Sequence, residues 1–285
     1  MAAHISTLHT SRLRTLVVPR EHGAWGMLLV PLATGAVVAL RTGMNGAALS
    51  LFIVTAMSLF WLRTPVESLL GASAIKAHTE EERALVMRAI AGIGALAAVS
   101  ATALLWNGHS RGLLIIGGIA GLAFALQAGV KQLGRKGRMP AQVIGAVGLT
   151  STAAGAYYVA TGRLDRVALA VWVANWLFAG DQVHFVQLRI RSSRAAGFQE
   201  KLKSGLPFFA GQAALLGVVL IACHVRFFPG LVWLAFVPVL LRGTYWFGRD
   251  WQSLDVHKLG FSELAHSLAF GALLCVVFLA STPVQ

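Results

Sequence analysis

Nine stretches of mainly apolar residues, each close to the length of a membrane crossing, divide this sequence. A transmembrane helix needs about 20 such residues. The stretches cover approximately residues 23–40, 47–62, 86–106, 112–130, 141–161, 167–188, 206–224, 228–247 and 262–281. In lipid every backbone polar group must be satisfied internally, which a helix achieves within one segment. The sequence therefore predicts an all-α polytopic membrane protein of about nine transmembrane helices, with eight or ten as alternatives.

The composition excludes a soluble enzyme. The 285 residues are 56% hydrophobic and only 12% charged, whereas soluble domains average about 45–50% and roughly 25%. So few charges cannot coat a water-soluble globule of this size, and so high an apolar content excludes disorder. The two cysteines, Cys223 and Cys275, both lie in apolar stretches. They indicate neither a disulfide framework nor a metal site built from paired cysteines.

The basic residues are distributed unevenly along the chain. With the N-terminus in the cytoplasm and nine spans, the inner segments receive 19 of the 24 lysines and arginines and the outer segments 5. This bias is typical of inner-membrane proteins. We therefore expect one integral domain over residues 1–285 in the inner (plasma) membrane, with a short basic cytoplasmic tail at 1–18 and the C-terminus outside. The net charge of +13 then reflects topology, and we expect no nucleic-acid partner.

The acidic residues gather on the predicted cytoplasmic side, with Asp165 as the one exception. The strongest candidate is Asp181, which lies roughly 10 Å inside the inner end of its span at about 1.5 Å per residue. His184 follows one helical turn later on the same face. Charged groups at this depth are costly and normally face a cavity or a partner. We take Asp181 and His184 as candidate catalytic residues, with a structural Asp–Arg or Asp–His hydrogen bond that holds helices together as the alternative.

A second cluster opens the first span, where Arg20, Glu21 and His22 stand together. A Glu-His pair beside an arginine is more than interfacial anchoring requires, although anchoring remains the alternative. The other polar residues expected at inner span ends are Arg63, Glu67, Arg189, Arg191 and Glu263. We expect all of them to converge with Asp181 and His184 in one ligand-binding site. The nine histidines show no spacing typical of a metal site, so no metal ligands are predicted.

Three further patterns carry structural predictions. Thr79 followed by Glu80-Glu81-Glu82 indicates a capped helix start. The basic run from Lys131 to Arg138 is typical of a contact with anionic membrane lipids. Small residues within spans permit close packing of helices. The glycines that we expect to allow such packing are Gly92, Gly117, Gly118, Gly121, Gly145, Gly148 and Gly211.

The opening Pro-Arg-Glu-His-Gly-Ala-Trp-Gly-Met-Leu-Leu-Val-Pro at residues 19–31 resembles the signature of the YwiC-like membrane proteins. Two later segments resemble that family more weakly, Phe185 to Arg191 and Leu259 to Glu263. The resemblance implies an integral membrane protein of the same kind, but it does not point to a particular reaction.

A more distant resemblance links the chain to the UbiA-type intramembrane prenyltransferases. Residues 139–162 are similar to the fifth span of that family, and residues 179–191 to the region of its second aspartate-rich motif. The resemblance implies a UbiA-like helical bundle that holds Mg²⁺ and a prenyl diphosphate between carboxylates. This sequence keeps only Asp181 in the second motif and only Glu67 in the first. Mg²⁺ is therefore expected only if the protein is an active prenyltransferase, and arginines could instead bind an anionic head group directly.

The sequence favours a protein that binds an amphiphilic small molecule, of isoprenoid, quinone or related lipid type, with its polar end toward the cytoplasm. One alternative is a prenyl or alkyl transferase with degenerate aspartate motifs, which a Mg²⁺-dependent activity would reveal. Another is a transporter or permease component, which solute counterflow in proteoliposomes would reveal. Whether the protein is an enzyme stays open at this point.

Overall fold

The computed structural model describes residues 15–18, 22–69, 76–134, 137–193, 198–248 and 255–281. Within these ranges the regular elements are helices, without strands. They are α2 (His22–Ala39), α3 (Gly46–Leu69), α4 (Glu80–Leu104), a wide turn η1 (Leu105–His109), α5 (Ser110–Lys131), α6 (Arg138–Thr150), α7 (Thr152–Thr161), α8 (Arg166–Ser192), α9 (Phe198–His224), α10 (Trp233–Gly248) and α11 (Val256–Ala280).

Every predicted span coincides with one of these helices or with the pair α6–α7. In the described part of the chain, six helical segments are long and apolar enough to cross a membrane, and α2 is a shorter apolar helix. The segment α10 is also short, with 16 residues, and α8 carries several polar side chains along its 27 residues. The class predicted from sequence, an all-α membrane protein, is confirmed, while the count of nine crossings stays a prediction.

Two predicted spans differ in detail from the observed helices. The eighth was expected to begin at residue 228, but α10 begins at Trp233, after a turn in which Val232 N–H donates to the Pro229 carbonyl at 3.0 Å. The fifth is divided at Ser151 into α6 and α7. Hydroxyl groups beside this break donate to helix carbonyls, Thr150 to Ala146 at 2.7 Å and Thr152 to Leu149 at 2.8 Å. Hydrogen bonds from hydroxyl side chains to carbonyls of the preceding turn compete with the backbone hydrogen bonds of the helix and often bend it.

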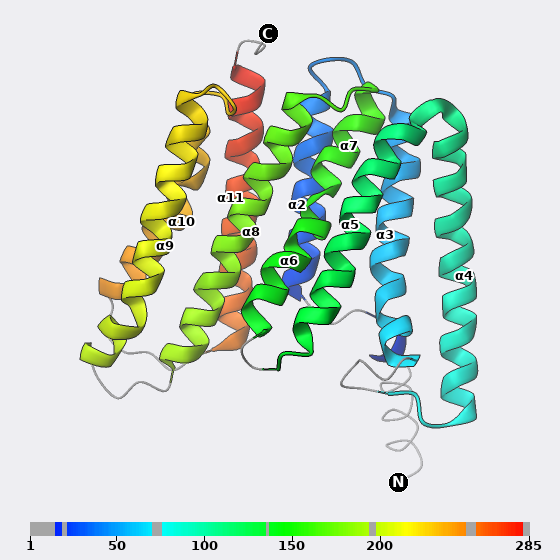
Figure 1. Ribbon diagram of the computed structural model, residues 1–285, viewed down its shortest axis with the longest axis horizontal. Coiled ribbons are helices and arrows are strands. Elements are labelled where there is room, and N and C mark those ends of the chain that lie inside the picture. The colour runs from blue at the N-terminus through cyan, green and yellow to red at the C-terminus, as the bar shows by residue number, and fades with distance from the viewer. Residues whose placement is uncertain are drawn as a thin grey trace. The chain divides into compact units, whose positions relative to one another are not determined.

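The described helices form two compact units, treated separately here. The first contains α3 and α4, which pack side by side (Figure 1). A hydrogen bond of 2.8 Å from Thr55 to Ser100 joins the two helices. The predicted capped start of α4 is confirmed, because the Thr79 side chain accepts from the Glu82 N–H and the Glu82 carboxylate accepts from the Thr79 N–H. Two backbone N–H groups at the start of the helix, which have no partner within the helix, are thereby hydrogen-bonded.

The second unit comprises α2, α5 from Gly112 onward, and α6 to α11. Helix α8 has the most neighbours in it, with contacts to α6, α7, α9, α10 and α11 (Figure 1). Stacked rings of Phe178 and Phe270, with centroids 4.2 Å apart, join α8 to α11. Because α8 is enclosed by other helices, its polar side chains can bond to protein groups instead of facing lipid, which offers no partners.

Helices α2 and α7 approach each other very closely within this unit. A Cβ atom added to Gly35 would lie 2.1 Å from the backbone oxygen of Ala153. The Thr152 hydroxyl also donates to the Leu28 carbonyl at 3.1 Å. The approach depends on the absence of a side chain at Gly35, because a Cβ would overlap a backbone atom that cannot rotate away.

Candidate functional site

Asp181 lies on the enclosed side of α8, and both of its carboxylate oxygens accept hydrogen bonds. The Gln212 amide, from α9, donates to Oδ1. The Arg242 guanidinium, from α10, donates to Oδ2 at 2.7 Å. The buried carboxylate therefore connects three helices through a charged partner and a neutral one.

Arg242 also binds a second carboxylate. Its Nη1 donates to Glu263 Oε2, on α11, at 2.5 Å. The side chains of Asp181, Arg242 and Glu263 are only 4%, 4% and 7% exposed. The guanidinium carbon lies 4.0 Å from the centroid of the Phe185 ring, where a cation is attracted by the aromatic face. We call Asp181, Gln212, Arg242 and Glu263 the buried cluster.

A layer of neutral hydrogen bonds adjoins the buried cluster on α8 and α11. The Gln182 amide donates to the Ser267 hydroxyl at 2.9 Å and to the Glu263 backbone carbonyl at 3.1 Å. The Ser267 hydroxyl donates to that same carbonyl at 2.8 Å. These bonds fix the helical turn of α11 that carries Glu263, and so they position its carboxylate toward Arg242.

Three atoms of the buried cluster are enclosed without a hydrogen-bond partner among the described residues. They are the acceptors Glu263 Oε1 and Gln212 Oε1 and the donor Arg242 Nε. Buried polar groups in folded proteins are rarely left unpaired, and an exception calls for an explanation such as an unseen bound species.

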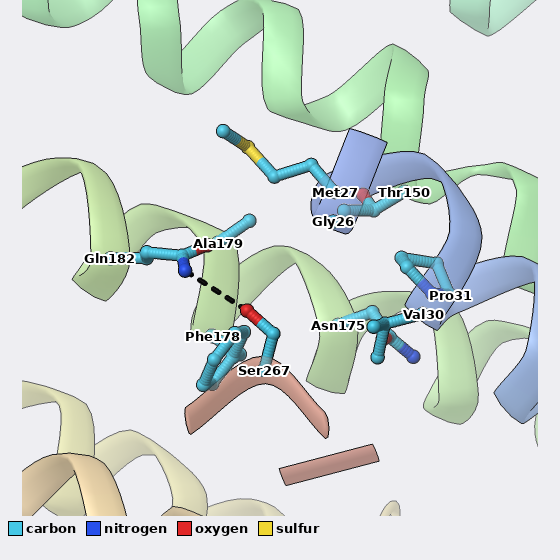
Figure 2. A pocket seen from close by; sticks show the side chains of 10 residues that line it. All are labelled: Gly26, Met27, Val30, Pro31, Thr150, Asn175, Phe178, Ala179, Gln182 and Ser267. Atoms are coloured by element: carbon cyan, nitrogen blue, oxygen red, sulfur yellow. Dashed lines mark hydrogen bonds between the residues drawn. The ribbon is translucent and has the colours of Figure 1, made fainter. Parts of the chain in front are cut away.

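A small pocket lies beside this layer (Figure 2). Its interior has room for about one water molecule. Its lining comes from α2, α6, α8 and α11 and consists of Gly26, Met27, Val30, Pro31, Thr150, Asn175, Phe178, Ala179, Gln182 and Ser267. Figure 2 shows the hydrogen bond from Gln182 to Ser267 among these side chains. The pocket thus combines an apolar wall with polar groups that belong to the layer beside the buried cluster.

The other predicted residues of α8 have different neighbours. The His184 ring packs edge-on against Phe208 with centroids 5.3 Å apart, and a Cβ on Gly211 would lie 3.1 Å from it. Asp181 is paired with Arg242, which is the kind of Asp–Arg bond between helices that the structural alternative describes. Arg189 lies over the Trp246 ring at 5.7 Å, and the exposed Arg191 contacts the Met139 sulfur at 3.6 Å.

The remaining predicted residues lie outside the described residues or in the first unit. Arg20 and Glu21 lie outside the described residues, and His22 begins α2 with its side chain likewise undescribed. The same holds for residues 1–14 of the basic tail and for residues 135 and 136 of the lipid-contact segment. Arg63 and Glu67 form an ion pair of 2.9 Å within α3, in the first unit. Of the predicted ligand-binding set, the structure joins Asp181 and Glu263 through one network.

Sequence reasoning missed Arg242 and Gln212. Arg242 interrupts the apolar run of residues 231–241, and a charged residue inside a span is a signal of a functional or paired position. The distribution of basic residues counts Arg242 with the inner segments, although it lies within the predicted span 228–247. Gln212 is a neutral side chain in an apolar stretch, and its sequence position carries no signal that it faces Asp181.

The carboxylates of the buried cluster do not fit Mg²⁺. The ion requires near-ideal octahedral oxygen ligation. Both oxygens of Asp181 and one of Glu263 are already bonded to Arg242 or Gln212, which leaves only Glu263 Oε1. The described residues contain no group of three or more histidine, cysteine or acidic side chains that could hold a metal. The positively charged guanidinium of Arg242 lies between the two carboxylates, where a metal ion would have to bind.

Comparison with known families matches residues 18–158 to the model of YwiC-like protein. Comparison with curated proteins and with solved structures finds no match. The matched region holds the Pro19–Pro31 stretch and helices α2 to α6, whereas the buried cluster lies beyond it. The match over residues 18–158 confirms the resemblance of this chain of membrane helices to the YwiC-like family that the Pro19–Pro31 stretch indicated.

Proposed function

We propose that this integral membrane protein binds the polar end of an amphiphilic molecule, of isoprenoid, quinone or related lipid type, beside the buried cluster. The observation that carries the proposal is the position of Gln182 and Ser267. Both line the small pocket, and both bond to the turn of α11 that carries Glu263. A molecule in the pocket would touch apolar side chains and the edge of a charged network at once, as an amphiphile requires.

The pocket size restricts how such a molecule is held. Sites for small molecules usually enclose about 300–1,000 Å³, whereas this pocket has room for about one water molecule. Only the tip of a polar head group would therefore reach into the pocket, and the rest of the molecule would lie between helices or in lipid. The basic distribution of the sequence places this polar end toward the cytoplasm in our proposal.

The chemistry of the donor groups favours binding over metal-dependent prenyl transfer. In that reaction several carboxylates hold the Mg²⁺ ions that neutralise the leaving diphosphate. Here Arg242 occupies the carboxylates of Asp181 and Glu263. A reaction that needs free carboxylates would first have to displace a buried guanidinium from two ion pairs.

The test is mass spectrometry of lipids that remain bound after purification in detergent. Gln182→Leu removes the amide that joins pocket and cluster while keeping a similar volume, and it should reduce the bound amphiphile at least tenfold. Gln187→Leu is the matched control on the same helix, because the Gln187 amide donates to the exposed Gln142 side chain at 3.0 Å. Equal lipid content in wild type and Gln182→Leu, with both proteins folded, would overturn the proposal.

A further inference from the structure

The buried cluster contains one more negative than positive charge when all its groups are ionised. Two carboxylates, Asp181 and Glu263, form ion pairs with one guanidinium, that of Arg242. Arginine stays protonated in proteins, so the guanidinium cannot adjust its charge. Within a membrane segment an unbalanced charge costs at least about 2.5–3.5 kcal/mol. The arrangement is therefore completed by one additional positive charge.

The unpaired atoms indicate where that charge is missing. Asp181 accepts a bond at each of its oxygens, whereas Glu263 accepts the bond from Arg242 at Oε2, and the Gln182 side chain interacts with the same carboxylate. Glu263 Oε1 and Gln212 Oε1 are both enclosed acceptors without a donor. Arg242 Nε, the one unpaired donor, belongs to a guanidinium whose other bonds already fix its orientation. The network lacks a donor, and it lacks one at Glu263.

Other charged groups surround the cluster without completing it. On α8, His184 faces Phe208 and Gly211, and Arg189 acts on Glu263 electrostatically from its position over Trp246. On α11, His266 lies one turn from Glu263 and interacts with it electrostatically, while its Nδ1 is 2.7 Å from the Ser262 carbonyl oxygen. From α9 the neighbour is the neutral Gln212, and from α10 it is Arg242. Among the described residues, Arg242 is the cation that forms ion pairs with either carboxylate.

We infer that the buried cluster binds one exchangeable proton, carried by Glu263 at Oε1. The proton comes from water, forms one O–H bond on the carboxylate and leaves the cluster neutral, with no change of oxidation state. A proton needs no cavity, and it provides the hydrogen-bond donor that the two unpaired oxygens lack. The inference goes beyond the proposed function, because the protein alone would take up this proton whether or not a lipid is bound.

Infrared difference spectroscopy of the purified, delipidated protein tests this directly. A protonated carboxyl group gives a carbonyl stretching band that shifts in heavy water. Wild type should show this band at the low end of a pH titration and lose it as the pH rises. Glu263→Gln should abolish the band by removing the proton carrier. Asp181→Asn should abolish it as well, because the remaining Arg242–Glu263 pair is already neutral.

Asp165→Asn is the matched control. Asp165 caps α8 by accepting from the N–H groups of Val167 and Ala168, a role that asparagine can also fill. Its spectrum should match that of wild type. Absence of the band from wild type, or its persistence in both Glu263→Gln and Asp181→Asn, would overturn the inference. A band that persists in Glu263→Gln and disappears only in Asp181→Asn would place the proton on Asp181 and also contradict it. Because no lipid is present, these outcomes are independent of the amphiphile proposal.

Discussion

At the scale of single residues, Arg242 connects helices of the second unit and is also a buried charge that needs negatively charged partners. Its guanidinium joins α8 and α11 through Asp181 and Glu263 and lies over the Phe185 ring. Replacing a whole buried ion network by apolar groups can be neutral, but removing one partner leaves the others as uncompensated charges. Arg242 is the sole cation between two acids in this part of the structure, and its removal should therefore have a larger effect than that of either acid.

Arg242→Gln should lower the free energy of unfolding by about 3–5 kcal/mol, the cost of breaking a buried pair by removing one partner. Arg242→Lys should be less severe, because an ammonium keeps the charge but cannot form two bonds in the fork geometry of a guanidinium. Thermal unfolding followed by tryptophan fluorescence in detergent measures both. Arg83→Gln is the control, since Arg83 pairs with Glu80 at an exposed site on α4 and should contribute about 0–1 kcal/mol. Equal effects at Arg242 and Arg83 would contradict this ranking.

At the scale of helices, the apolar stretches predicted the positions of the elements because span length is set by the membrane. The break at Ser151 and the start of α10 at Trp233 were not predictable from hydrophobicity, since they depend on local hydrogen bonds. Which side chains of different helices contact each other is harder still to predict. Asp181 and Glu263 stood out as charges near span ends, whereas Gln212 faces Asp181 only because α9 packs against α8.

Only some of the glycines predicted to allow close helix packing have a near neighbour. A Cβ at Gly145 would lie 2.5 Å from the Gln127 side chain, and Gly148 and Gly211 also have near neighbours. Around the other four predicted positions, Gly92, Gly117, Gly118 and Gly121, nothing lies within 4 Å. The tightest contact with backbone in α2 occurs at Gly35, which the sequence did not single out. A glycine's position in a span does not reveal which face of its helix meets a neighbour.

Gly35→Ala should destabilise the second unit by about 1–3 kcal/mol or more, because the new methyl group would overlap the Ala153 backbone oxygen and force α2 and α7 apart. Gly117→Ala is the control, since its surroundings are open. Alanine there should leave stability unchanged or raise it by up to about 1 kcal/mol through its higher helix propensity. Thermal unfolding of the two variants compares them. A Gly35→Ala protein as stable as Gly117→Ala would show that the close approach is absent.

At the scale of the whole molecule, sidedness determines which compartment the buried cluster serves. With the nine predicted spans and the N-terminus inside, the predicted inner segments contain 19 lysines and arginines and the predicted outer segments 5, and such a bias sets orientation in membranes. An even number of crossings would place both termini on one side and would disturb the split. The count of spans and the direction of the polar site therefore depend on each other.

Reporter fusions test this topology. A reporter active only in the cytoplasm should function at the N-terminus and in the segment after α8, while one active only outside should function at the C-terminus and after α7. These positions follow from nine crossings with the N-terminus inside. Both termini reporting from the same side would contradict the count, and reversal of all four reporters would place the polar site at the outer face.

The central claim is that the buried cluster serves ligand binding rather than structure alone, and Asp181→Asn tests it most directly. The change removes the excess negative charge while Glu263 still neutralises Arg242, so most of the stability should remain. We predict a melting temperature within a few degrees of wild type, a shift that corresponds to about 1 kcal/mol, together with loss of the co-purified amphiphile by mass spectrometry. A stable Asp181→Asn protein that retains its lipid would contradict the claim, as would a variant that loses stability and lipid together.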